Sequence, residues 1–93
     1  MIRQPAYNEQ FERHRAAVLI PTYNNAGTLG AVLNDVLTYT PHIIVVNDGS
    51  TDETNTVLAQ FPWLDVVSYR PNRGKGIALR RGFAHAVKEG YDY

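Results

Sequence analysis

The stretch that decides the fold is Ile43-Ile44-Val45-Val46-Asn47-Asp48-Gly49-Ser50. Its first half is apolar and β-branched throughout, which is typical of a strand that is covered on both faces in a parallel sheet. Its second half is polar and is expected to break the strand. Residues 50–53 fit a capping box, in which Ser50 accepts a hydrogen bond from the Glu53 amide and Glu53 reaches back. We therefore expect a short helix after this stretch, ended by Pro62.

The alternation of strand and helix extends toward the N-terminus. Residues 16–20 form a short apolar run, which predicts a buried strand that ends at Pro21. Between residues 29 and 37, apolar side chains recur at helical spacing and predict an amphipathic helix. This helix is expected to end near Thr40, because Pro41 disfavours helical geometry in the residue before it.

The alternation also extends toward the C-terminus. Residues 64–69 predict a third strand, and residues 77–89 predict a second long helix whose Leu79, Phe83 and Val87 are spaced to face the sheet. Gly90 is expected to stop this helix, and residues 91–93 resemble the approach to a fourth strand. The order β-α-β-α-β-α predicts an α/β fold with a parallel sheet, right-handed crossovers and helices on both faces, truncated before its fourth strand.

Composition indicates one small globular unit. The chain has 93 residues, of which 44% are hydrophobic and 19% are charged. We expect 1–15 to be a polar N-terminal flank, helical at 7–13 or unfolded, and 16–93 to be the folded domain. The absence of cysteine excludes disulfides and cysteine-based metal sites. No apolar run approaches the ~20 residues of a membrane span and the flank lacks the apolar core of a secretory signal, so a cytoplasmic setting is the default.

Three polar loops follow the three predicted strands, at 21–25, 47–50 and 72–76. Open α/β sheets bind ligands outside the carboxyl ends of their strands. We therefore predict a binding site where these loops meet. The candidate contacts are Pro21, Thr22, Tyr23, Asn25, Asp48, Arg73, Lys75 and Gly76.

Each candidate has both a functional and a structural interpretation. Tyr23 offers an aromatic face for a base, or it is packed at a loop. Asp48 can accept a hydrogen bond from a base imide or a ribose hydroxyl, or it is a turn aspartate that bonds its own backbone. Lys75, between two glycines and before a helix, can meet a phosphate at the helix amides, or it is a solvated lysine. For Arg73 we favour an anion-binding role.

Several other functions lack support in the sequence. No Gly-x-Gly-x-x-Gly follows the first strand, which argues against a dinucleotide fold, and no P-loop motif occurs. The three histidines lie in unrelated segments, so metal ligation by them is not expected. No serine or threonine lies in a nucleophile-elbow context, so hydrolase chemistry has no support either.

Three motifs resemble a known family. Leu19-Ile20-Pro21-Thr22-Tyr23-Asn24, Val45-Val46-Asn47-Asp48-Gly49-Ser50-Thr51-Asp52 and Asn72-Arg73-Gly74-Lys75-Gly76 resemble the family 2 glycosyltransferases of the Rossmann-like GT-A fold. They look especially like the branch of the dolichyl-phosphate mannose synthases and related polyprenyl-phosphate sugar transferases. The resemblance covers roughly residues 16–93, with all three motifs in order at matching strand ends.

The resemblance implies a nucleotide-diphosphate-sugar donor, Mg²⁺ or Mn²⁺, and sugar transfer with inversion. Pro21 and Tyr23 would frame the base, Asp48 would bond the base or ribose, and Lys75 would lie near the base or diphosphate. Asn25 and Asn47 depart from the acidic residues common at those positions, which leaves the branch and the base open. The acceptor is expected to be a polyprenyl phosphate or a glycan rather than a nucleic acid. Parent enzymes of this branch often work at the cytoplasmic membrane face.

The family's Asp-x-Asp metal motif ends a fourth strand, and an acidic general base follows it. Both are expected beyond Tyr93, so we predict neither catalytic nor metal-binding residues within the chain, and no sugar transfer by these residues alone. Leu29, Val32 and Phe83 are expected to lack cover and to promote self-association. The alternatives are a non-catalytic nucleotide- or partner-binding module of the same fold and, with less support, a GT-A nucleotidyltransferase. The latter would carry a glycine-rich basic loop after the first strand.

Overall fold

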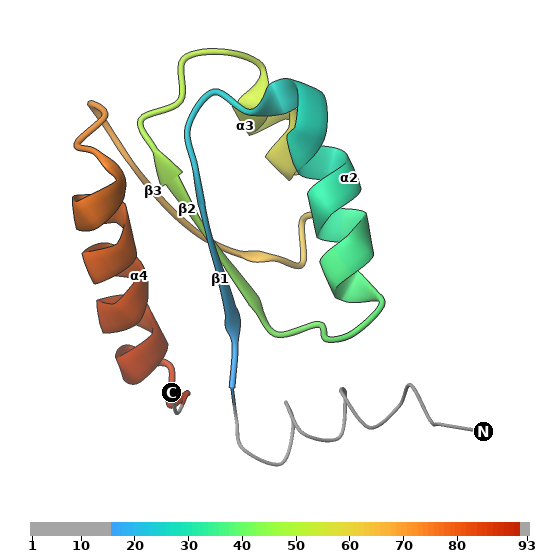
Figure 1. Ribbon diagram of the computed structural model, residues 1–93, viewed down its shortest axis with the longest axis vertical. Helices are drawn as coiled ribbons and strands as arrows, with labels where there is room; N and C mark the ends of the chain where they lie inside the picture. The colour runs from blue at the N-terminus through green and yellow to red at the C-terminus, as the bar shows by residue number, and fades with distance from the viewer. Residues whose placement is uncertain (1–15, 92–93) are drawn as a thin grey trace.

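The computed structural model describes residues 16–91 as an open sheet with helices on both faces. In chain order its elements are β1 (Val18–Thr22), α2 (Ala26–Leu37), β2 (Ile43–Asp48), α3 (Thr54–Ala59), β3 (Asp65–Tyr69) and α4 (Lys75–Lys88) (Figure 1). The strands are parallel and lie in the order β1-β2-β3. This arrangement confirms the predicted α/β class. The N-terminal flank, including the helix considered at 7–13, lies outside the described residues, as do Asp92 and Tyr93.

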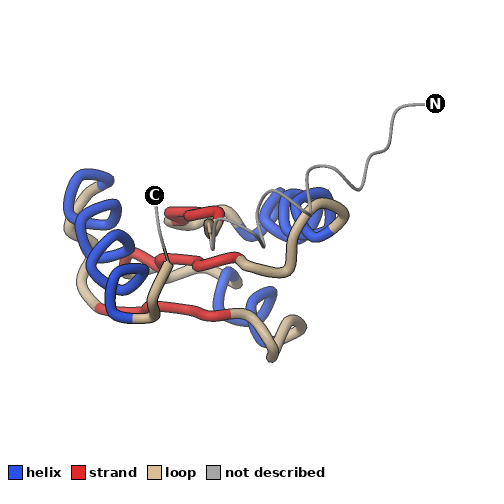
Figure 2. Tube along the Cα trace, turned by 90° about the horizontal axis from the view of Figure 1, so that it is seen from below, coloured by secondary structure: helices blue, strands red, loops and turns tan. Residues whose placement is uncertain are grey.

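The central strand β2 separates two small cores. In the register, Val18 pairs with Ile43 and Ile44 pairs with Asp65. All residues of β2 are buried. Because successive side chains of a strand point to opposite faces, Ile43 and Val45 pack with α2 and α3, whereas Ile44 and Val46 pack with α4. Figures 1 and 2 show α4 on one side of the sheet and α2 and α3 on the other.

Helix α4 faces the sheet with small residues, which corrects the sequence prediction. Its buried side consists of Ala78, Gly82 and Ala86, whereas Phe83 and Val87 are 45% and 60% exposed and Leu79 is half-buried. Two faces of this helix share the same four-residue spacing, one with larger apolar side chains and one with smaller residues. The smaller residues face the sheet because they let the helix backbone approach the strands closely.

Several element boundaries differ from the predicted ones. β1 continues through Pro21 to Thr22, β2 continues to Asp48, and α4 begins at Lys75 rather than at Ile77. Gly90, which follows the C-cap residue Glu89 of α4, has a φ of 87°, and the Tyr91 amide donates to the Ala86 carbonyl, so the predicted glycine stop is confirmed. The extension of β1 and β2 places the polar loop residues on the ends of the strands themselves.

The predicted capping box is wrong. α3 begins at Thr54, four residues after Ser50, and Glu53 makes no side-chain cap. The Ser50 amide instead donates to Asn47 Oδ1 at 3.3 Å, and Ser50 Oγ accepts a hydrogen bond from the Asn24 amide at 3.1 Å. Ser50 therefore forms hydrogen bonds with loop residues and does not cap the helix that follows it.

Of the three apolar residues that were expected to be exposed, only two are. Leu29 is 2% exposed and belongs to the core beside α2, so it needs no further cover. Val32 and Phe83 are each nearly half exposed, and self-association through them stays a prediction. Among the described residues, no helix is long and apolar enough to cross a membrane.

Candidate functional site

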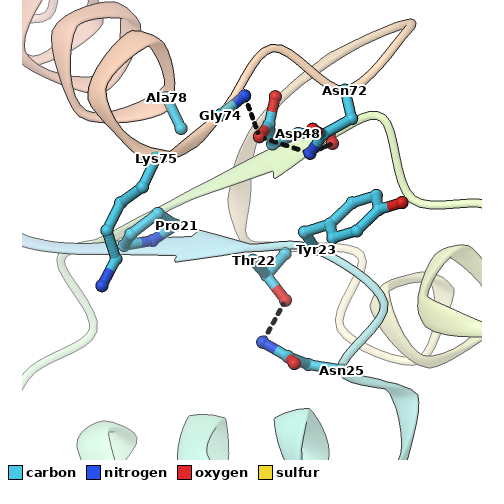
Figure 3. Close-up of a pocket in the computed structure, with 9 residues that line it drawn as sticks. All are labelled: Pro21, Thr22, Tyr23, Asn25, Asp48, Asn72, Gly74, Lys75 and Ala78. Carbon is cyan, nitrogen blue, oxygen red and sulfur yellow. Dashed lines mark hydrogen bonds between the residues drawn. The ribbon is translucent and has the colours of Figure 1, made fainter.

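The three loops meet around one cavity of about 360 Å³ at the carboxyl ends of the strands. Residues from β1 and its loop, from the end of β2 and from the start of α4 face one another across it (Figure 3). The lining residues are Pro21, Thr22, Tyr23, Asn25, Asp48, Asn72, Gly74, Lys75 and Ala78. The predicted convergence of the three loops is therefore present in the structure.

Most of the predicted contacts line this cavity, but two do not. Arg73 and Gly76 are exposed and lie beside the lining residues in sequence without joining them. Conversely, Asn72, Gly74 and Ala78 line the cavity but were not among the predicted contacts. Asn72 and Gly74 belong to the third motif, so membership of that motif could have identified them as lining residues. Ala78 could have been found only by recognising the small-residue face of α4.

The first two loops are tied together by side chains that bond backbone amides. Asn24, which has a φ of 51°, accepts hydrogen bonds at Oδ1 from the amides of Thr51 and Asp52, at 2.8 and 3.2 Å. In the opposite direction, Asp52 Oδ2 accepts from the Ala26 amide at 3.3 Å. These bonds fix the turn between β1 and α2 and with it the position of Tyr23, a residue that is 46% exposed and lines the cavity.

The Asp52 carboxylate also accepts a hydrogen bond at the start of α3. Its Oδ1 accepts from the Thr54 amide at 2.8 Å. Hydrogen bonding to Thr54 is the main reason that the pKa of Asp52 lies below its usual value, and the bond from Ala26 acts in the same direction. Because the folded state favours the ionised form, this group stabilises the fold above the ordinary carboxyl pKa and ceases to do so as the pH falls below it.

Asp48 is 3% exposed, and its carboxylate is bonded to the third loop. Oδ1 accepts from the Arg73 amide at 2.8 Å, and Oδ2 accepts from the Gly74 amide at 3.0 Å and from Asn72 Nδ2 at 2.7 Å. The bonds from Asn72 and Gly74 are among the dashed lines of Figure 3. Asp48 is thus not a turn aspartate that bonds its own backbone, because its partners lie 24–26 residues further along the chain.

Gly49 allows this approach of the third loop. It has a φ of 72°, and a Cβ at this position would lie 2.3 Å from the backbone nitrogen of Asn72. Any other residue would therefore combine a strained backbone with a direct clash. The end of β2 and the loop before α4 form one closely packed unit.

The N-terminus of α4 borders the cavity. Gly74 precedes the helix with a φ of 93°, no side chain of the described residues caps it, and its first turn holds no acidic residue. The first intrahelical bond runs from the Ala78 amide to the Gly74 carbonyl, at 3.0 Å. The amides of residues 75–77 precede that bond, so they are available to an acceptor outside the helix. Together with the Lys75 ammonium group, they make this edge of the cavity suited to an anion.

Tyr69 lies behind this edge, at the end of β3. Its hydroxyl is buried without a hydrogen-bond partner among residues 16–91, and the Arg81 guanidinium lies 4.6 Å from its ring centroid. Burial is the main cause that raises the pKa of Tyr69 to about 12, followed by the Asp48 carboxylate. The phenol is therefore neutral throughout the physiological range.

Within the described residues, no group of three or more histidine or acidic side chains is arranged to hold a metal ion. His85 instead pairs with Asp65, with its Nε2 2.9 Å from each carboxylate oxygen, near the other end of α4. The chemistry that residues 16–91 bring to the cavity is thus hydrogen bonding, an aromatic face and a positively charged rim.

Comparison with known proteins identifies a family model and several relatives, all of which are glycosyltransferases. The sequence model of the family described as glycosyl transferase family 2 matches residues 17–91. A dolichyl-phosphate beta-glucosyltransferase of Saccharomyces cerevisiae is 31% identical over 85 residues, which covers 74% of this chain and 25% of that protein. The human dolichyl-phosphate beta-glucosyltransferase is 31% identical over 83 residues, covering 71% of this chain and 26% of that protein.

A bacterial relative is more similar over a shorter stretch. The uncharacterized glycosyltransferase YaiP of Escherichia coli is 40% identical over 75 residues, covering 74% of this chain and 19% of that protein. The chain thus spans between about a fifth and a quarter of the length of these relatives. No solved structure is significantly similar to it.

Proposed function

Because the chain belongs to glycosyl transferase family 2, we propose that its cavity binds the donor of a sugar transfer, a nucleotide-diphosphate sugar. The observation that carries this proposal is the convergence of all three loops on one cavity at the carboxyl ends of the strands. This is where open α/β sheets bind nucleotides. The whole protein would move the donor's sugar to an acceptor, with inversion at the anomeric carbon.

Each part of the donor has a matching part of the cavity. The base packs between Pro21 and the exposed ring of Tyr23, where an aromatic face favours stacking. Thr22 and Asn25, which are bonded to each other at 3.2 Å, offer polar atoms to the base or the ribose. The diphosphate lies at the start of α4, beside Lys75. Arg73 and Gly76 do not line the cavity, so we propose for them only contacts with a donor that extends beyond it.

The resemblance implies Mg²⁺ or Mn²⁺, but residues 16–91 do not fit a metal site. They hold no cluster of three potential ligands, and the Asp48 carboxylate already accepts hydrogen bonds from the third loop. We therefore route no step through a metal. The contribution of the described residues is donor binding and orientation, and the groups that activate the acceptor belong to other parts of the protein.

For the acceptor we propose a polyprenyl phosphate. Two of the relatives are named as dolichyl-phosphate glucosyltransferases, and the three sequence motifs resemble the same branch. A phosphate of this kind is presented at a membrane surface, so we place the reaction of the whole protein at the cytoplasmic membrane face.

Calorimetric titration with UDP, GDP, CDP and dTDP, each with and without Mn²⁺, tests donor binding. We expect one of the four to bind, with an affinity that does not depend on Mn²⁺. Stacking on an aromatic side chain contributes about 1–3 kcal/mol per base, so Tyr23→Ala should weaken binding by at least about fivefold.

Tyr39→Ala is the matched control for Tyr23→Ala. Tyr39 is equally exposed, at 45%, but lies between α2 and β2, at the opposite ends of the strands. The Tyr39→Ala substitution should leave the affinity for the nucleoside diphosphate unchanged. Absence of binding for all four diphosphates, or equal effects of the two substitutions, would refute the proposed site.

A further inference from the structure

The basic residues of the chain are concentrated in one segment. Residues 70–88 contain no acidic side chain and six of the nine lysines and arginines, namely Arg70, Arg73, Lys75, Arg80, Arg81 and Lys88. Residues 16–69 contain no lysine or arginine, and their acidic side chains are Asp35, Asp48, Asp52, Glu53 and Asp65. Because α4 lies on one side of the sheet and α2 and α3 on the other (Figure 2), a net charge of zero conceals a positive side and a negative side.

The solvent side of α4 carries apolar side chains among these cations. We call it the outer face of α4 and define it as the exposed residues Arg80, Phe83, Ala84, Val87 and Lys88. Residues three and four positions apart are neighbours on a helix surface, so Phe83 and Val87 adjoin each other, and each adjoins Arg80 or Ala84. Phe83 and Val87 are 45% and 60% exposed, whereas the side that packs on the sheet holds only small residues. Clustered apolar side chains with a polar rim are typical of an interaction surface.

An anionic lipid surface fits both properties of the outer face. Negatively charged headgroups attract lysine and arginine, and apolar side chains of a basic helix enter the boundary between headgroups and acyl chains. The aliphatic stems of Arg80 and Lys88 can lie along that boundary while their charged ends stay among the headgroups. The phosphates of a nucleic acid duplex would use the cations but not Val87, and a second copy that met this face symmetrically would bring like charges together.

We propose that the outer face of α4 docks the protein on an anionic lipid surface, with Arg80 and Lys88 at the headgroups and Phe83 and Val87 between them. This inference goes beyond the donor site, and it rests on the proposed function only for the presence of a lipid surface near the acceptor. Lys75, the first residue of α4, lines the cavity. A lipid surface along α4 therefore lies beside the cavity, where it would hold a lipid-linked acceptor close to the donor.

The test is cosedimentation of the full chain with phosphatidylcholine vesicles that contain or lack phosphatidylserine. We expect binding to the anionic vesicles at about 0.1 M salt and its loss at about 1 M salt, where the screening length falls from about 10 to about 3 Å. Each cation near an anionic surface contributes about fivefold in affinity, so Arg80→Gln with Lys88→Gln should weaken binding by about tenfold to thirtyfold. Asn34→Asp with Thr56→Glu is the matched control, because it makes the same change in net charge at exposed positions of α2 and α3. It should change the affinity by less than about twofold.

The single tryptophan of the chain reports which side meets the lipid. Trp63 is 64% exposed, but it packs on Phe61, which belongs to the core between the sheet and the helices α2 and α3. Vesicles should therefore neither shift its fluorescence to the blue nor allow brominated lipids to quench it. Phe83→Trp in a Trp63→Phe background moves the reporter to the outer face, where we expect both signals. Circular dichroism checks that each variant is folded.

Several outcomes would overturn the inference. These are equal binding to vesicles without phosphatidylserine, equal effects of the two double substitutions, and quenching of Trp63 in the parent. Tighter binding to a duplex oligonucleotide than to the anionic vesicles would assign the face to nucleic acid instead. A blue shift of the outer-face reporter that depends on protein concentration and not on vesicles would assign it to a second copy. Vesicle binding needs no nucleotide, so its failure leaves the proposed donor site untouched, and failure of all four nucleoside diphosphates to bind leaves this inference untouched.

Discussion

Gly82→Ala is expected to destabilise the fold, because Gly82 lies at the closest approach of α4 to the sheet. A Cβ at this position would lie 2.6 Å from Leu19 Cδ1 and 2.9 Å from Val46 Cγ2. Non-bonded carbon atoms prefer a separation of about 3.5–4.0 Å, so either the helix moves outward or both side chains turn. Overpacking of this kind costs about 1–3 kcal/mol, whereas alanine gains up to about 1 kcal/mol over glycine within a helix. We expect a net loss of about 1 kcal/mol in the free energy of unfolding.

Gly30→Ala provides the matched control for this prediction. It is the same change in the interior of a helix, but the nearest atom to its Cβ would be Val57 Cγ1, at 3.9 Å, which is an ordinary contact. We expect it to gain about 0.5–1 kcal/mol, because only the helix preference acts there.

Urea unfolding followed by circular dichroism measures both effects, provided that the two variants keep the m-value of the parent. In a thermal scan, 1 kcal/mol corresponds to a shift of about 4–8 °C for a domain of this size. Equal stabilisation by Gly82→Ala and Gly30→Ala would refute the reasoning, since it would mean that the α4 interface has room for a methyl group.

Four further expectations can be checked in solution. The lowered pKa of Asp52 predicts that part of the stability is lost as the pH falls below about 4, and Asp52→Asn should show a smaller loss between pH 7 and pH 3 in urea titrations. The raised pKa of Tyr69 predicts that its phenol ionises only near pH 12 and that stability falls between about pH 10 and 12. Ultraviolet titration at alkaline pH would show this late step, and Tyr69→Phe should remove it without loss of stability at pH 7, because its hydroxyl has no partner among residues 16–91. Light scattering should detect concentration-dependent association that Val87→Lys weakens, since Val87 is 60% exposed on α4; a clean monomer in the parent would contradict this. The 93-residue chain should not consume a nucleotide-diphosphate sugar in a coupled assay, and measurable turnover would show that the catalytic groups are present after all.

The parts of the fold that could be predicted from the sequence are those set by neighbouring residues. The β-branched run at 43–46 and the glycines and prolines between segments act locally, so the order of strands and helices followed from them. Parallel pairing then placed the three loops at one edge, because the carboxyl ends of parallel strands lie together. The cavity was predictable for this reason.

The parts that failed depend on contacts between distant segments. The four-residue pattern at 50–53 satisfied the capping rule, but Ser50 and Asp52 are used by residues 24 and 26 of the previous loop. The alternative that Asp48 is a turn aspartate is wrong, because its carboxylate accepts from residues more than twenty positions along the chain, whereas its contact with a ligand stays a prediction. In α4, side-chain size favoured the wrong face, because local spacing does not reveal how closely a helix approaches a sheet.

The bonds between Asn24, Thr51 and Asp52 restrict how the loops around the cavity can vary in evolution. They join side chains to particular backbone amides across two loops, so an inserted or deleted residue between β1 and α2 would put every one of them out of register. The exposed side chain of Tyr23 takes no part in these links and can be exchanged without disturbing them. New ligand preferences should therefore arise here by substitution rather than by change of loop length, which makes the first loop suitable for saturation mutagenesis.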